Sequence, residues 1–135
     1  MTEQQDVSHK GRVLEVYDRL HKPHLVMILR LHDGVLDIEP SAEARAHIEQ
    51  DLVLGREEAR HLPVIGWLME KAVLFAEERM AGYFGPHDLS KVRIRFDGQT
   101  MHLHVGRTDL DLGPGEIDLV AAAAFVREFE SLKRR

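Results

Sequence analysis

Two Asp-Gly dipeptides, at residues 33–34 and 97–98, constrain the fold more than any other feature of the chain. Each dipeptide lies between two stretches rich in apolar and β-branched residues, which is the pattern of a β-hairpin closed by a tight turn. The flanking stretches are residues 25–32 and 35–39 for the first dipeptide, and residues 92–96 and 99–105 for the second. We therefore predict two antiparallel β-hairpins.

A two-residue turn fixes the register of the first hairpin. It places Leu31 opposite Leu36 and Arg30 opposite Asp37. Apolar side chains then face each other and opposite charges meet, which is the arrangement that stabilises neighbouring strands.

The same reasoning places Ile94 opposite Met101 and Arg93 opposite His102 in the second hairpin. Residues 108–112, with the sequence TDLDL, alternate between apolar and acidic side chains. This alternation predicts a short fifth strand.

Periodicity, capping residues and helix breakers predict four helices in the remaining segments. Their expected ranges are residues 8–21, 41–54, 63–84 and 116–133, with Ser8 and Ser41 as N-caps of the first two. The resulting order is αββα followed by αββ(β)α, which suggests an internal pseudo-repeat.

The length of 135 residues fits one domain. We expect a single α+β domain over residues 1–135, with a polar tail at residues 1–8 and the two hairpins in one sheet of four or five strands. About four helices are expected to pack mainly on one face of that sheet.

Composition excludes several classes of protein. The chain has no cysteine, so it holds no thiolate nucleophile, no cysteine-based metal site and no disulfide framework. We therefore expect the protein to be located in the reducing cytoplasm. Its longest apolar runs are far shorter than the ~20 residues of a membrane span, so no membrane partner is expected. No nucleophile or phosphate-loop motif is present, and neither a catalytic residue nor a cofactor is predicted.

The predicted third helix carries the strongest interaction signal. An apolar stripe spaced by seven residues is edged by charged side chains, and one helix face packed on a sheet would leave this stripe uncovered. The stripe consists of Trp67, Leu74 and Ala81, and the charged rim consists of Glu70, Lys71 and Glu78. We predict a homodimer interface anchored by Trp67, or alternatively a stripe covered by another helix of the same chain.

The outer face of the second hairpin is basic. Arg93, Arg95, His102 and His104 alternate with apolar residues and should point the same way, with Arg107 near the end of the hairpin. Such a face can contact phosphates, so nucleic-acid binding is one hypothesis. The alternative is an ordinary solvated sheet face, because the aromatic side chains that stack on bases are missing and the formal net charge is -5.

His102 and His104 also have a spacing compatible with metal binding, because alternate strand residues project from one side. Asp109 and Asp111 could supply carboxylates, and two histidines with a carboxylate can bind a divalent metal and leave a position for water. A metal-dependent hydrolase is therefore a third hypothesis, which the two nearby arginines oppose. We favour a small, non-enzymatic, cytoplasmic protein-interaction module that forms a homodimer through the third helix.

Overall fold

The computed structural model describes residues 11–18, 24–46 and 83–134. These residues form two antiparallel sheets and two α-helices, so the α+β class is confirmed and the predictions of one sheet and of about four helices are wrong. The first sheet has the order β1 (Val13–Tyr17), β2 (Leu25–His32), β3 (Val35–Pro40) and β4 (Gly85–Asp88). The second has the order β5 (Val92–Phe96), β6 (Met101–Val105) and β7 (Thr108–Leu112).

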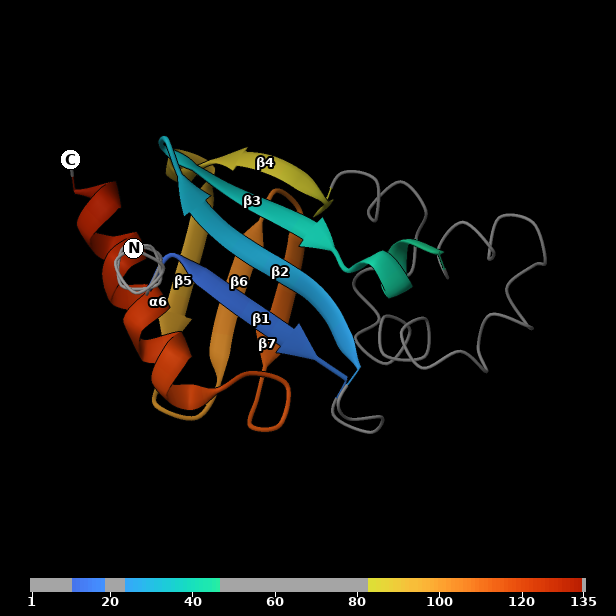
Figure 1. Ribbon diagram of the computed structural model, residues 1–135. Helices are drawn as coiled ribbons and strands as arrows, with labels where there is room; N and C mark the ends of the chain where they lie inside the picture. The colour runs from blue at the N-terminus through green and yellow to red at the C-terminus, as the bar shows by residue number, and fades with distance from the viewer. Residues whose placement is uncertain (1–10, 19–23, 47–82, 135) are drawn as a thin grey trace, which may run out of the picture.

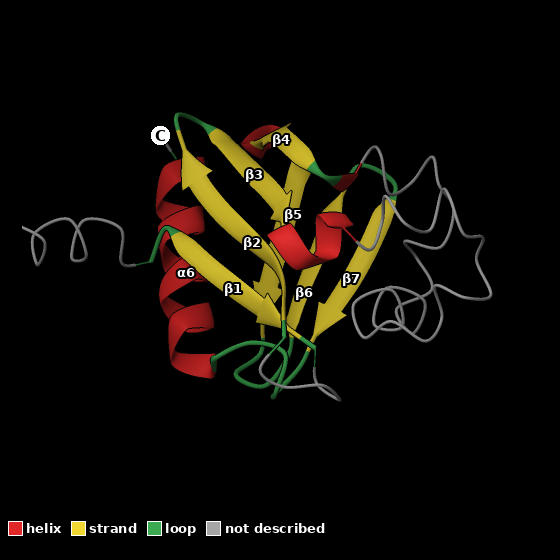
Figure 2. Ribbon diagram, turned by 45° about the vertical axis from the view of Figure 1, so that its right-hand side comes forward, coloured by secondary structure: helices red, strands yellow, loops and turns green. Residues whose placement is uncertain are grey.

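The two sheets pack face to face with crossing strands, and the helix α6 (Leu119–Lys133) lies along one side of both (Figures 1 and 2). Leu29 from the first sheet, Leu103 from the second and Phe125 from α6 are all fully buried members of one apolar cluster. Burial of such side chains supplies the main favourable free energy of folding. Each sheet therefore has one face in the core and one face outside it.

The first hairpin has the predicted register. Leu31 pairs with Leu36 and Arg30 with Asp37. The turn residues Asp33 and Gly34 have φ values of 48° and 77°. Positive φ at both positions is the geometry of the two-residue turn whose twist matches paired strands, and it favours Asp-Gly.

The second hairpin differs from its prediction by two residues. Ile94 pairs with Leu103 instead of Met101, and Arg93 pairs with His104 instead of His102. The cause is the loop between the last paired residues, Phe96 and Met101. It contains the four residues 97–100 instead of the expected two. Because a shift of two residues preserves the side-chain alternation, each residue stays on its predicted face.

Residues 13–17 form the edge strand β1 and not the first predicted helix. The sequence VLEVY is compatible with the helical period and with the strand period. In the structure it follows the strand period, since Leu14 and Val16 are buried on one face while Glu15 between them is exposed. Pairing with β2, a contact between separate segments, decides in favour of the strand. The predicted αββα order of the first half, on which the pseudo-repeat depended, is therefore wrong.

The second predicted helix is present over residues 42–46, and Ser41 is its N-cap, because its Oγ accepts a hydrogen bond from the backbone N–H of Ala44 (3.0 Å). The rest of this helix and nearly all of the third lie outside the described residues. Residues 85–88, which follow the expected end of the third helix, form β4 on the edge of the first sheet, where Pro86 is tolerated. The 3-10 helix η1 (Leu89–Lys91) connects β4 to the second sheet.

The last helix is confirmed, with a later start than predicted. Asp118 is the N-cap of α6 and accepts a hydrogen bond from the backbone N–H of Ala121 (2.9 Å). Glu116, expected inside the helix, precedes it and is buried, and its Oε1 accepts a hydrogen bond from the N–H of Gly113 (3.0 Å). None of the helices in the described ranges is long and apolar enough to cross a membrane.

Candidate functional site

Six charged or titratable side chains form a regular array on the outer face of the β5–β7 sheet, and we call this array the charged face. Strand pairing arranges them in two rows across the three strands, one containing Arg93, His104 and Asp109, and the other containing Arg95, His102 and Asp111. Both arginines lie on β5, both histidines on the central strand β6 and both aspartates on β7. Basic side chains therefore follow one edge of the sheet and acidic side chains the other.

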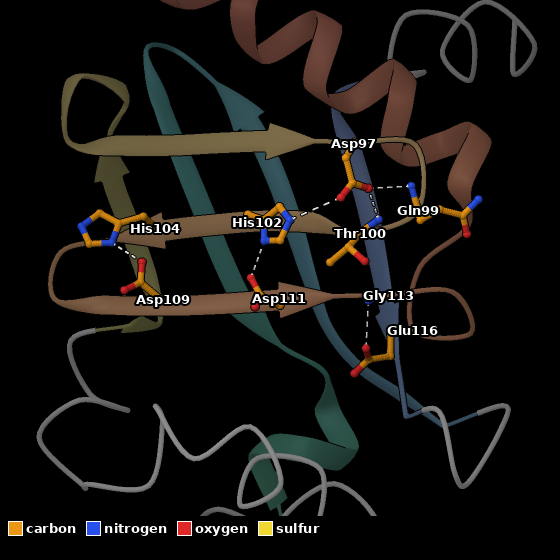
Figure 3. Close-up of polar contacts among 9 residues, drawn as sticks. All are labelled: Asp97, Gln99, Thr100, His102, His104, Asp109, Asp111, Gly113 and Glu116. Carbon is orange, nitrogen blue, oxygen red and sulfur yellow. Dashed lines mark hydrogen bonds and ion pairs between the residues drawn. The ribbon is translucent and has the colours of Figure 1, made fainter.

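The histidines are held by the aspartates of the next strand (Figure 3). His102 Nδ1 donates a hydrogen bond to Asp111 Oδ1 at 2.7 Å, and His104 Nδ1 donates to Asp109 Oδ1 at 2.5 Å. Each pair joins directly opposite residues of an antiparallel ladder, which are close enough for side chains to interact. The carboxylates of β7 therefore fix the orientation of both imidazole rings.

The loop between β5 and β6 adds a further carboxylate beside the charged face. Asp97 accepts hydrogen bonds from the backbone N–H groups of Thr100 (2.8 Å) and Gln99 (2.9 Å), and its Oδ2 lies 3.6 Å from His102 Nε2. These backbone hydrogen bonds, that of Thr100 first, lower the pKa of Asp97, because they stabilise the ionised carboxylate. Among the described residues, His102 thus lies between two carboxylates, whereas His104 contacts one.

The charged face is open to solvent. His102 and His104 are about one third exposed, while Asp109 and Asp111 are more than two thirds exposed. The array lines an open depression of about 490 Å³, with Ile94 and Leu103 as its other lining residues. Small-molecule sites usually enclose most of their ligand, so this shape favours contact with a surface over capture of a small substrate.

The structure brings together most of the residues proposed for nucleic-acid and metal binding. Four of the five basic residues share the charged face, and Arg107 lies beyond the rows in the turn between β6 and β7. The four residues of the predicted metal site also lie together. However, within the described ranges no group of three or more His, Asp or Glu side chains is placed to hold a metal ion.

The predicted helical interface lies outside the described residues. Its members are Trp67, Glu70, Lys71, Leu74, Glu78 and Ala81. The homodimer that they predict therefore stays a prediction.

Outside the charged face, a buried tyrosine lies just before β4 of the first sheet. The side chain of Tyr83 is fully buried, and its hydroxyl has no hydrogen-bond partner among the described residues. Burial raises the pKa of Tyr83, because the charged phenolate would be desolvated. His87 Nε2 donates a hydrogen bond to the Tyr83 carbonyl oxygen (2.6 Å), while Asp88 accepts from the N–H of Ser90. His87 and Asp88 therefore bond to different groups.

No known protein family, curated protein or solved structure matches the chain.

Proposed function

We propose that the protein is a non-enzymatic interaction module and that its charged face contacts a protein partner. The observation that carries this proposal is the separation of charge across three strands, with Arg93 and Arg95 on one edge and Asp109 and Asp111 on the other. A protein surface presents both signs of charge within a short distance. It can therefore complement both edges at once, and such complementarity gives specificity and register.

The charge balance of the face favours a protein over a polyanion. The two arginines of the face are balanced by the two aspartates. A nucleic-acid backbone that contacted the arginines would also approach the exposed carboxylates of Asp109 and Asp111, which repel phosphate.

Nucleic-acid binding is nevertheless the second candidate, because one observation favours it. Among the described residues, no hydrogen bond or ion pair engages the side chain of Arg93 or Arg95, so both guanidinium groups can contact a ligand. The metal-dependent hydrolase has less support, since His102 and His104 each bond to a different aspartate.

An affinity experiment with matched variants tests the proposal. The variant Arg93→Glu with Arg95→Glu reverses the basic edge, and Arg127→Glu with Arg134→Glu makes the same change of net charge at two exposed positions, one within α6 and one at its C-cap. We expect the wild type and the α6 control to retain the same protein from a nuclease-treated extract of its own cells, while the face variant loses it. Equal retention by all three would contradict the proposal.

A second measurement separates the two candidates. Fluorescence anisotropy with mixed-sequence single-stranded and duplex oligonucleotides would be recorded between ~50 and ~200 mM salt. The proposal predicts no binding that depends on Arg93 and Arg95. Binding that weakens steeply with salt, with a reduced slope in the face variant, would establish nucleic-acid binding in its place.

A further inference from the structure

The charged face is electrostatically complementary to a copy of itself. Its arginine edge and aspartate edge are separated by the histidine strand β6, and strands are spaced by about 4.8 Å, so the two edges lie roughly 10 Å apart. Along each strand, the two members are separated by two residues, which corresponds to roughly 7 Å. The array is therefore a small rectangle of roughly 10 Å by 7 Å, in which one of the two shorter sides is positive and the other is negative.

Only one kind of two-fold axis within the plane of this face brings opposite charges together. An axis parallel to β6 exchanges the β5 and β7 edges while it preserves the position along the strands. Arg93 of one copy then lies over Asp109 of the other, and Arg95 lies over Asp111. An axis across the strands would place the arginines of one copy over those of the other, which is unfavourable.

We propose that the partner of the charged face is a second copy of this chain, aligned by a two-fold axis parallel to β6. This inference rests on the proposed function, because it names the protein that the charged face contacts. The contact is isologous, so each arginine–aspartate pair occurs twice and the interface holds four such pairs. The carboxylates of Asp109 and Asp111 can accept from an arginine while they hold their histidines, since an ionised carboxylate accepts several hydrogen bonds.

The size of the face sets the strength of this contact. Three strands of five residues cover roughly 250 Å² of surface, from the ordinary strand spacing and rise. Stable protein interfaces bury about 800 Å² on each partner. We therefore expect the charged face alone to give weak, reversible self-association that salt suppresses.

Charge reversal on each edge tests the inference in the full-length chain. The first variant is Arg93→Glu with Arg95→Glu, and the second is Asp109→Arg with Asp111→Arg. Each variant alone would place like charges over one another in a homodimer, and we expect its self-association to weaken more than about tenfold. An equimolar mixture restores opposite charges at all four contacts, so we expect a heterodimer at least as strong as the wild-type dimer.

Sedimentation equilibrium at low salt over a range of protein concentrations measures all these species. Circular dichroism checks that each variant is folded, and Arg127→Glu with Arg134→Glu is the control that should self-associate as the wild type does. Recovery of association only in the mixture would support the inference. A monomeric wild type, unchanged self-association in both face variants, or two folded variants that fail to pair would each overturn it.

The affinity experiment distinguishes failure of this inference from failure of the proposed function. In one outcome, the wild type does not self-associate through this face but retains a different protein, which the variant Arg93→Glu with Arg95→Glu loses. In that case only the second-copy inference is wrong. If neither self-association nor protein retention responds to the substitutions, both are wrong.

Discussion

The two faces of the β5–β7 sheet are built from the same strands but differ in what their side chains contact. On the inner face, Leu103 and Leu110 are 1% and 2% exposed and belong to the core shared by both sheets and α6. On the outer face, His102 and Asp111 are 33% and 69% exposed and bond to each other. The inner face therefore supplies stability through burial, and we expect the outer face to accept changes of charge without loss of the fold.

Neighbouring residues of β6 give the largest contrast. Leu103→Ala removes a buried side chain and leaves a cavity, so we expect it to lower the free energy of unfolding by about 2–5 kcal/mol. His102→Ala removes a partly exposed side chain from the opposite face, and we expect a loss below about 1 kcal/mol. Urea denaturation of both variants measures this difference. A loss of similar size in His102→Ala would show that the outer face contributes as much to the free energy of unfolding as the core does.

The histidine–aspartate pairs should be weakly coupled. A double-mutant cycle with His104→Ala and Asp109→Ala should give a coupling energy of about 0.2–1 kcal/mol, because opposite residues on an exposed sheet face interact in water. The pair of His102 and Asp111 provides a matched cycle two residues along the strand. A coupling above about 2 kcal/mol for either pair would show that the outer face is shielded from solvent.

The smallest expected effect concerns Asp97 and depends on pH. Its folded pKa is lowered by hydrogen bonds from Thr100 and Gln99, so its ionised form stabilises the native state. This contribution is fully present above the ordinary value near 3.8 and is lost as the pH falls through the lower folded value. We expect Asp97→Asn to lower the Tm at pH 6, and the difference from the wild type to narrow below pH ~4. A difference that does not change with pH would contradict this account of the loop.

The two hairpins show how far local sequence determines pairing. Around Asp33 and Gly34, the turn chemistry and the apolar pattern agree, and the predicted register is correct. Around Asp97, the same dipeptide begins a four-residue loop, because the carboxylate accepts from the N–H groups of residues 99 and 100. An Asp-Gly dipeptide alone does not distinguish these two outcomes, since both begin with an aspartate that can bond to nearby backbone.

The composition of the charged face was nevertheless predictable. An error of two residues in register keeps Arg93 and His104 on the same face, because strand side chains alternate with period two. The contact between Asp97 and His102 depends on the loop conformation, so the sequence pattern does not predict it. The division into two sheets and the strand character of residues 13–17 depend on contacts between distant segments, which no local pattern reports.

Cross-linking at the centre of the charged face reports whether two copies of the chain meet through this face. The chain contains no cysteine, so His104→Cys introduces a single thiol on β6, and His32→Cys introduces one at an exposed position of the other sheet. A bifunctional thiol reagent that spans the roughly 10 Å between packed sheets should link His104→Cys into a dimer and leave His32→Cys monomeric. Equal cross-linking of both variants, or none in His104→Cys at concentrations where the protein self-associates, would contradict a contact between copies through this face.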